Sequence, residues 1–133
     1  MLQLKYRLLF EFDLLRKKNI MIQIYHNPRC GKSRNCLAFI EETGQEFEVI
    51  KYLEETPSFQ ELASIIKKLN CKPINLVRVK EKIWIDSYKD KSLTDDEIIQ
   101  AMVDNPILIE RPIVIKGEKA IIGRIIEDVA TFI

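Results

Sequence analysis

The chain has 133 residues, a net charge of +1 at pH 7 and a hydrophobic fraction of 47%. This length predicts a single domain, and the apolar fraction is that of an ordinary globular protein. Because positive and negative charges nearly balance, we expect neither nucleic acid nor an acidic membrane as the main partner.

The cysteines and the single histidine limit the kinds of site that the chain can build. Cys30, Cys36 and Cys71 form no even, regularly spaced set, which argues against a disulfide framework and against a zinc site. We therefore expect no bound metal. Since cytosolic thiols stay reduced, we interpret the protein as cytoplasmic.

Residues 1–20 differ from the rest of the chain. They mix apolar and charged side chains and contain no apolar run long enough for a signal peptide or a membrane span. One alternative is an amphipathic helix that lies on the domain or on a membrane. The plainer interpretation is that Met21 opens the domain, and that residues 1–20 are an N-terminal extension from an upstream, non-native start. Residues 21–133 are then a single domain.

A strand, a helix and a second strand are predicted at the start of this domain. Residues 21–25 alternate in polarity and are followed by a turn. From residue 31 to 43, apolar side chains recur on one helical face, and Gly44 gives a C-terminal stop. Residues 47–50 are predicted to form the second strand, which completes a right-handed parallel βαβ unit.

Helices and a hairpin are predicted in the remainder. The segments are helices beginning at the capping-box sequences 58–61 and 94–97, a short helix or turn at 73–78, a hairpin at 112–122 and a final helix from residue 126. This order predicts an α/β protein with the thioredoxin-like fold. Its four-stranded mixed sheet has a helical insertion between the βαβ and ββα halves.

Cys30 follows the first predicted strand and precedes the first predicted helix. A helix N-terminus lowers the pKa of a thiol, and its free N–H groups bind anions. A lone cysteine is often only a small buried hydrophobic residue. His26 is placed to donate a hydrogen bond or charge to the thiolate, or else to be a turn residue satisfied by the backbone. We interpret Cys30 as a reactive nucleophile.

Ser33 lies one helical turn after Cys30, where Cys-x-x-Cys redox proteins have their second cysteine. Its hydroxyl at i+3 faces back towards residue 30 on a helix. The alternative is a plain solvent-exposed serine. Because a serine forms no disulfide, an external thiol is the expected reductant. Cys36 lies on the apolar helix face and is predicted to be in the core, while Cys71 is interpreted as a structural residue or an exposed bystander.

Three arginines in the second half, Arg78, Arg111 and Arg124, are candidates for anion binding. Each alone is more typical of a solvated surface charge. The guanidinium group binds tetrahedral oxyanions in a bidentate manner, so several converging on one thiolate would select a phosphate-like substrate. Arg111 also precedes Pro112, and a cis bond to proline opposite the active cysteine is a feature of thioredoxin-like domains.

Five segments of residues 21–133 form a recognisable set. They are residues 24–35, Tyr52-Leu53-Glu54, Leu76-Val77-Arg78, residues 93–97 and residues 105–114. Together they resemble the glutaredoxin-linked arsenate reductase (ArsC) family of thioredoxin-like proteins. The resemblance covers the whole predicted domain, and the first and last segments are the most specific.

The resemblance implies an activity and a site. Cys30 would be the nucleophile that attacks arsenate, with His26 and Ser33 supporting its thiolate. The oxyanion pocket would consist of Arg78, Arg111 and Arg124. No cofactor would be bound; glutathione would act as the reducing co-substrate, and glutaredoxin would regenerate Cys30 from its mixed disulfide with glutathione.

Two alternatives belong to the same superfamily. One is a glutathione-linked thiol-disulfide oxidoreductase that does not process arsenate, since any anionic thiol partner would use the arginines. The other is a transcription regulator that binds RNA polymerase. Those regulators resemble this domain but use a Cys-x-x-Cys switch, so Ser33 argues against them.

Overall fold

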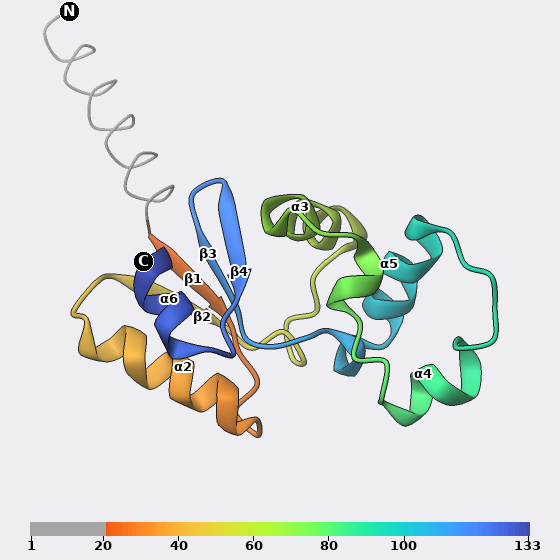
Figure 1. Cartoon of the computed structure of the whole chain (residues 1–133), viewed down its shortest axis with the longest axis horizontal. Helices are drawn as coiled ribbons and strands as arrows, with labels where there is room; N and C mark the ends of the chain where they lie inside the picture. The colour runs from red at the N-terminus through yellow and green to blue at the C-terminus, as the bar shows by residue number, and fades with distance from the viewer. Residues whose placement is uncertain (1–20) are drawn as a thin grey trace, which may run out of the picture.

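The computed structural model describes residues 21–133, and the interpretations of residues 1–20 lie outside this range. The strands of its sheet are β1 (Ile22–Tyr25), β2 (Phe47–Ile50), β3 (Ile113–Lys116) and β4 (Lys119–Ile122) (Figure 1). The helices are α2 (Gly31–Glu42), α3 (Phe59–Leu69), α4 (Lys82–Ser87), α5 (Asp95–Asp104) and α6 (Ile126–Phe132), with 3-10 turns η1 (Pro73–Leu76) and η2 (Pro106–Leu108). Within this range, every helix is too short or too polar to cross a membrane.

The sheet has the strand order β2-β1-β3-β4. Strand β1 pairs parallel with β2 and antiparallel with β3, and β3 pairs antiparallel with β4. The βαβ half is therefore β1-α2-β2 and the ββα half is β3-β4-α6, with α3, α4 and α5 between them in sequence. This arrangement confirms the predicted thioredoxin-like fold.

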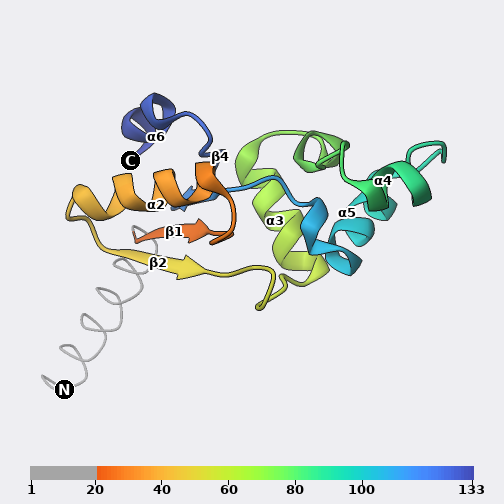
Figure 2. The same ribbon diagram turned by 90° about the horizontal axis from the view of Figure 1, so that it is seen from below.

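Helices cover both faces of the sheet. On one face, Ile24 and Val114 pack with Cys36 and Ile40 of α2 and with Val129 of α6; Figure 2 shows these two helices on the same side of β1 and β2. On the other face, alternate residues of β3 and β4 join a larger core with α3 and α5. Because side chains alternate along a strand, β3 contributes buried residues to both cores.

Helices α3 and α5 of the insertion each begin with a polar N-cap residue. Ser58 Oγ accepts a hydrogen bond from the Glu61 N–H at 3.1 Å. Thr94 and Glu97 form the complete reciprocal capping box. Both predicted helix starts are confirmed, and each cap satisfies an N–H group that has no partner inside the helix.

Helix α4 and turn η2 were not predicted. Helix α4 has six residues and buries one of them, Trp84, which stacks on Tyr88 with ring centroids 5.4 Å apart. A segment of that length is too short to show a helical period, so its position depends on this tertiary contact. Figure 1 shows α4 and α5 at the end of the molecule away from α2 and α6.

Candidate active site

Four segments of the chain meet at one edge of the sheet. Strands β1 and β2 both end there, because Tyr25 pairs with Ile50, and the His26 N–H donates to the Ile50 carbonyl at 2.8 Å. Strand β3 begins at the same edge and β4 ends there, because Ile113 lies opposite both Tyr25 and Ile122. The residues brought to this edge are His26, Asn27 and Cys30 after β1, Tyr52 after β2, Arg111 before β3 and Arg124 after β4.

Cys30 is the N-cap residue of α2, with extended backbone angles of φ −97° and ψ 122°. Burial raises the pKa of its thiol, but the backbone N–H of Ser33, the Arg111 guanidinium and the backbone N–H of Lys32 together outweigh burial and lower the pKa from 9.0 to about 7. A substantial fraction of Cys30 is therefore thiolate at neutral pH. The thiolate is the form that attacks an electrophile.

Ser33 is fully buried, and its side chain is directed towards His26 and Asn27. Its Oγ lies 2.6 Å from His26 Nδ1 and accepts a hydrogen bond from the Asn27 N–H at 3.0 Å. Burial, followed by the charges of Lys51 and Arg34, lowers the pKa of His26, so the ring is neutral at pH 7. The structure thus joins His26 to Ser33, and it is the backbone N–H of Ser33 that stabilises the thiolate.

Asn27 ties the loop between β1 and α2 together. Its carbonyl accepts from the Cys30 N–H at 3.0 Å, and its side-chain Oδ1 accepts from the Arg29 N–H at 3.0 Å. With the bond from its own N–H to Ser33, Asn27 fixes the turn that presents Cys30 at the helix start. Sequence reasoning treated Asn27 only as part of a turn signal.

Arg111 is the charged side chain that lowers the pKa of the Cys30 thiol. Its peptide bond to Pro112 is cis. Within the described part of the chain, its side-chain atoms Nε and Nη1 are buried and have no hydrogen-bond partner. An arginine side chain contains only donors, so each of these buried nitrogens is able to bind an acceptor.

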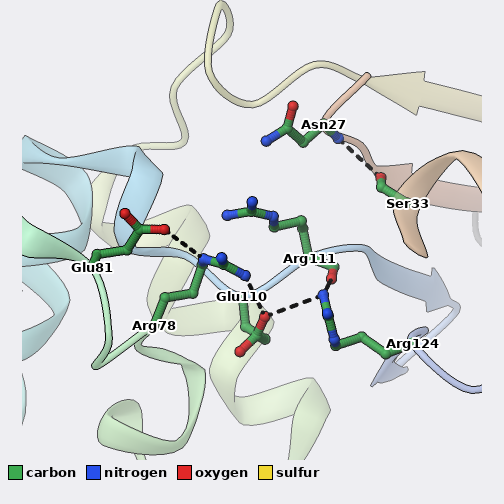
Figure 3. Close-up of polar contacts among 7 residues, drawn as sticks. All are labelled: Asn27, Ser33, Arg78, Glu81, Glu110, Arg111 and Arg124. Atoms are coloured by element: carbon green, nitrogen blue, oxygen red, sulfur yellow. Dashed lines mark hydrogen bonds and ion pairs between the residues drawn. The ribbon is translucent and has the colours of Figure 1, made fainter. Parts of the chain in front are cut away.

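Arg78 and Arg124 both contact one carboxylate, that of Glu110 (Figure 3). Arg78 Nη1 lies 3.1 Å and Arg124 Nη1 lies 3.5 Å from Glu110 Oε1. Arg78 Nε also pairs with Glu81 at 3.1 Å, and Arg124 Nη1 donates to the Arg111 carbonyl at 2.9 Å. The structure therefore brings the three predicted arginines into one cluster, but two of them are already paired with acidic side chains.

A short pairing between distant segments positions Arg78 beside Glu110. Val77 and Ile109 form an antiparallel bridge. On either side of it, the Arg78 N–H donates to the Leu108 carbonyl at 2.7 Å, and the Glu110 N–H donates to the Leu76 carbonyl at 2.8 Å. The insertion is thereby fastened to the segment that leads into β3.

A cavity of about 350 Å³ lies at this cluster. Its lining includes Arg78, Glu81, Glu110 and Arg124. Cys30 is not part of the lining. The cavity is therefore formed by the arginines that are paired with carboxylates, and the thiol lies outside it.

The other two cysteines differ from Cys30 in that their pKa values are raised. Cys36 is fully buried, as predicted, and burial raises its pKa to about 11. Burial also raises the pKa of half-buried Cys71. Among residues 21–133, no cluster of three or more His, Cys, Asp and Glu side chains is arranged to hold a metal ion.

Sequence reasoning gave no role to Tyr52 or Glu110, which the structure places at the same edge. Both lie in segments that matched the family pattern, but an isolated tyrosine after a strand reads as a core residue. Glu110 stands next to Arg111 in sequence, and the structure shows that it pairs with Arg78 instead. The long-range Val77–Ile109 bridge brings the two residues together.

The fold and the site define a thioredoxin-like protein with a cysteine of lowered pKa at the start of its first described helix. The sequence model of the ArsC family matches residues 25–132. The chain therefore belongs to the ArsC family.

Individual relatives agree with this family. An arsenate reductase of Neisseria meningitidis serogroup A is 41% identical over 110 residues, covering 81% of this chain and 94% of the relative. The uncharacterized protein YfgD of Escherichia coli K12 is 46% identical over 110 residues, covering 81% and 92%. Among solved structures, an arsenate reductase from Vibrio cholerae superimposes with a TM-score of 0.81 at 40% identity, covering 86% of this chain and 98% of that one.

Proposed function

We propose that this protein is an arsenate reductase in which Cys30 is the single nucleophile and glutathione with glutaredoxin supplies the electrons. The observation that carries the proposal is a thiol of pKa about 7 beside a guanidinium with two buried nitrogens that have no partner in the described residues. A thiolate next to such a guanidinium suits a negatively charged electrophile. The names of the relatives in Neisseria meningitidis and Vibrio cholerae support arsenate as that electrophile.

The first step is a displacement at arsenic. The Cys30 thiolate forms an S–As bond, and one arsenate oxygen leaves as water after taking up protons. Arg111 and the backbone N–H groups of Lys32 and Ser33 stabilise the negative charge on the remaining oxygens. Arg78 and Arg124 complete the positive side of the pocket.

Two thiols supply the two electrons of the reduction. Glutathione attacks the adduct, the S–As bond breaks and arsenite leaves, and a disulfide forms between Cys30 and glutathione. Arsenic gains two electrons while the two sulfurs lose two. A glutaredoxin thiol then takes the glutathionyl group and releases the Cys30 thiolate. This cycle needs the reduced glutathione pool of a compartment such as the cytoplasm.

His26 and Ser33 act in this proposal as positioning residues. Their 2.6 Å contact, together with the bond from the Asn27 N–H to Ser33, holds the turn before α2. A fixed turn keeps the N–H groups of the helix start directed at the sulfur. The neutral state of His26 adds no charge to the site at pH 7.

The test is arsenate-dependent oxidation of NADPH in the presence of glutathione, glutaredoxin and glutathione reductase. We expect turnover by the wild type and by Cys71→Ser, and none by Cys30→Ser. After incubation with arsenate and glutathione alone, mass spectrometry is expected to find one glutathione on Cys30. Replacement of glutathione and glutaredoxin by thioredoxin and its reductase tests the choice of reductant.

Absence of wild-type turnover with every thiol donor would overturn the arsenate assignment. If the same protein then reduced mixed disulfides of glutathione, it would be a thiol-disulfide oxidoreductase of this fold. Equal turnover by Cys30→Ser would refute the role of the nucleophile while leaving arsenate as the substrate.

A further inference from the structure

Tyr52 is a fully buried tyrosine with an unpaired hydroxyl. Its side chain has an exposed fraction of 0%, and within residues 21–133 its Oη has no hydrogen-bond partner. Unpaired buried hydroxyls are rare in folded proteins, because such a group loses its hydration without replacement. Each instance calls for an explanation, and a ligand is one of the recognised ones.

The other unpaired buried atoms lie in the same region. Across the described residues, Nε and Nη1 of Arg111 are the remaining buried side-chain atoms without a partner. Burial has the largest effect on Tyr52 and raises its pKa, whereas the Arg111 charge lowers it and the Cys30 charge raises it. These effects agree with the strand pairing, because Tyr25 lies opposite both Ile50 and Ile113, so the segments that hold Tyr52 and Arg111 meet at one edge of the sheet.

The order of the strands explains why Tyr52 is there. It follows β2 by two residues, and β2 ends beside β1, where the His26 N–H bonds to the Ile50 carbonyl. Asn27, just after β1, also lowers the pKa of Tyr52 through its side chain, although the Tyr52 hydroxyl has no hydrogen-bond partner of good geometry within residues 21–133. The hydroxyl is thus at the sheet edge that presents Cys30 and Arg111.

The unpaired atoms share one chemical property. The two Arg111 nitrogens are donors, and the Tyr52 hydroxyl is able to donate as well. A set of donors beside a thiolate nucleophile matches a species rich in acceptor oxygens. None of these atoms has to break an existing bond with residues 21–133 before binding, so the set is preorganised.

We propose that the Tyr52 hydroxyl donates a hydrogen bond to an oxygen of the oxyanion that Arg111 holds against Cys30, which makes Tyr52 a substrate-binding residue. The inference rests on the oxyanion site of the proposed function and adds a neutral donor to its arginines. A neutral hydroxyl contributes direction to the site without further charge.

The variant Tyr52→Phe separates a binding role of the hydroxyl from a structural one, because the two roles predict different effects on the stability of the fold and on the affinity for anions. Removing a hydroxyl that has no partner leaves the fold as stable as before or more stable. Removing a donor to an anion weakens binding of that anion by about ten-fold or more. The variant keeps the ring, so packing is preserved.

Binding is measured as protection of Cys30. The full chain is alkylated with iodoacetamide without glutathione, and the concentration of inorganic phosphate that halves the rate is determined. We expect Tyr52→Phe to need about ten-fold more phosphate or arsenate than the wild type, with an unchanged alkylation rate in the absence of anion and an equal or higher Tm. Tyr88→Phe is the matched control, because the Tyr88 hydroxyl already accepts from Asn105 Nδ2 at 3.1 Å; we expect wild-type protection.

Several results would overturn the assignment of Tyr52. The first is equal protection of Tyr52→Phe and wild type, and the second is failure of both phosphate and arsenate to protect the wild type. The third is a lower Tm of Tyr52→Phe with unchanged protection, which would indicate a solvent molecule as the partner of the hydroxyl. Protection of the wild type that Tyr52→Phe weakens, without arsenate turnover, would refute the reductase while supporting the contact of Tyr52 with the oxyanion. The two proposals therefore fail separately.

Discussion

Glu110 Oε1 lies 3.1 Å from Arg78 Nη1, so the arginine cluster contains a carboxylate before any anion binds. The same oxygen lies 3.5 Å from Arg124 Nη1, and Glu81 occupies Arg78 Nε. Three arginines against two carboxylates leave one positive charge in excess. The acidic side chains hold two of the arginines in place and moderate the attraction for anions.

Glu110→Gln should therefore raise the affinity of the site for oxyanions. The amide carbonyl still accepts hydrogen bonds from Arg78 and Arg124, so their positions are kept while one negative charge is lost. For a partly solvated pair, we expect about three- to ten-fold tighter phosphate binding. The phosphate affinity is measured by protection of Cys30 from alkylation. The difference in affinity between the variant and the wild type should shrink as ionic strength rises.

The control for this variant is Glu118→Gln, which makes the same change of charge at an exposed position in the turn between β3 and β4. We expect its phosphate affinity to equal that of the wild type. Weaker binding by Glu110→Gln would show that the ionised carboxylate is needed to orient the arginines, which contradicts the charge argument.

Alkylation of Cys30 should follow a titration centred near pH 7. The pKa of its thiol is lowered from 9.0 to about 7, so the thiolate fraction, and with it the alkylation rate, rises through this range and levels off above pH 8. Peptide mass spectrometry after brief treatment with iodoacetamide between pH 5 and 10 follows each cysteine separately. Cys36 is the internal control, because it is buried and its pKa is raised to about 11.

Arg111→Gln should move that titration to higher pH. The guanidinium lowers the pKa of Cys30 both by hydrogen bonding and by its charge, whereas burial raises it. Without the guanidinium, burial is opposed only by the N–H groups of Ser33 and Lys32, so the midpoint shifts towards the ordinary thiol value. An unchanged midpoint would mean that the helix start alone accounts for the reactivity of Cys30.

The sequence was sufficient to predict the fold and the position of Cys30, because those features depend on local patterns. Each of these patterns is recognisable within a few residues: the alternation of polarity in β1, the helix that begins after Cys30, and the capping residues Ser58 and Thr94. Cys36 was predicted to be in the core from its place on one helix face, and it is fully buried.

The contacts of the arginines could not be predicted in the same way. Arg78 meets Glu110 across 32 residues of sequence, through the Val77–Ile109 bridge. The direction of the Ser33 hydroxyl depends on the neighbouring His26 ring and Asn27 N–H, and helical spacing alone pointed it towards Cys30. The unpaired hydroxyl of Tyr52 is visible only when all of its surroundings are known.

Ser33→Ala should destabilise the protein because it leaves buried polar groups without a partner. The Asn27 N–H and His26 Nδ1 both contact Ser33 Oγ, which is fully buried. The expected loss is about 1–3 kcal/mol in the free energy of unfolding, measured by urea denaturation. Ser92→Ala, at an exposed position, is expected to cost far less. Equal stability of the two variants would contradict the importance of the His26–Ser33–Asn27 contacts.

Gly123→Ala should damage the packing that supports Arg124. A Cβ at Gly123 would lie 3.0 Å from Cys36 Sγ, 3.1 Å from Val114 Cγ2 and 3.2 Å from Val129 Cγ2, all of them in the core between the sheet and α2 and α6. These neighbours are fully buried, so the expected cost is about 1–3 kcal/mol in the free energy of unfolding. Gly31→Ala is the control, since its Cβ would meet only the end of the Arg34 side chain at 3.7 Å.

Because Gly123 also donates its N–H to the Pro112 carbonyl at 2.8 Å, a shift there moves the backbone between Arg111 and Arg124. Gly123→Ala should therefore bind phosphate more weakly than the wild type. Wild-type stability together with wild-type phosphate binding would show that the core accommodates the added methyl group without moving the site.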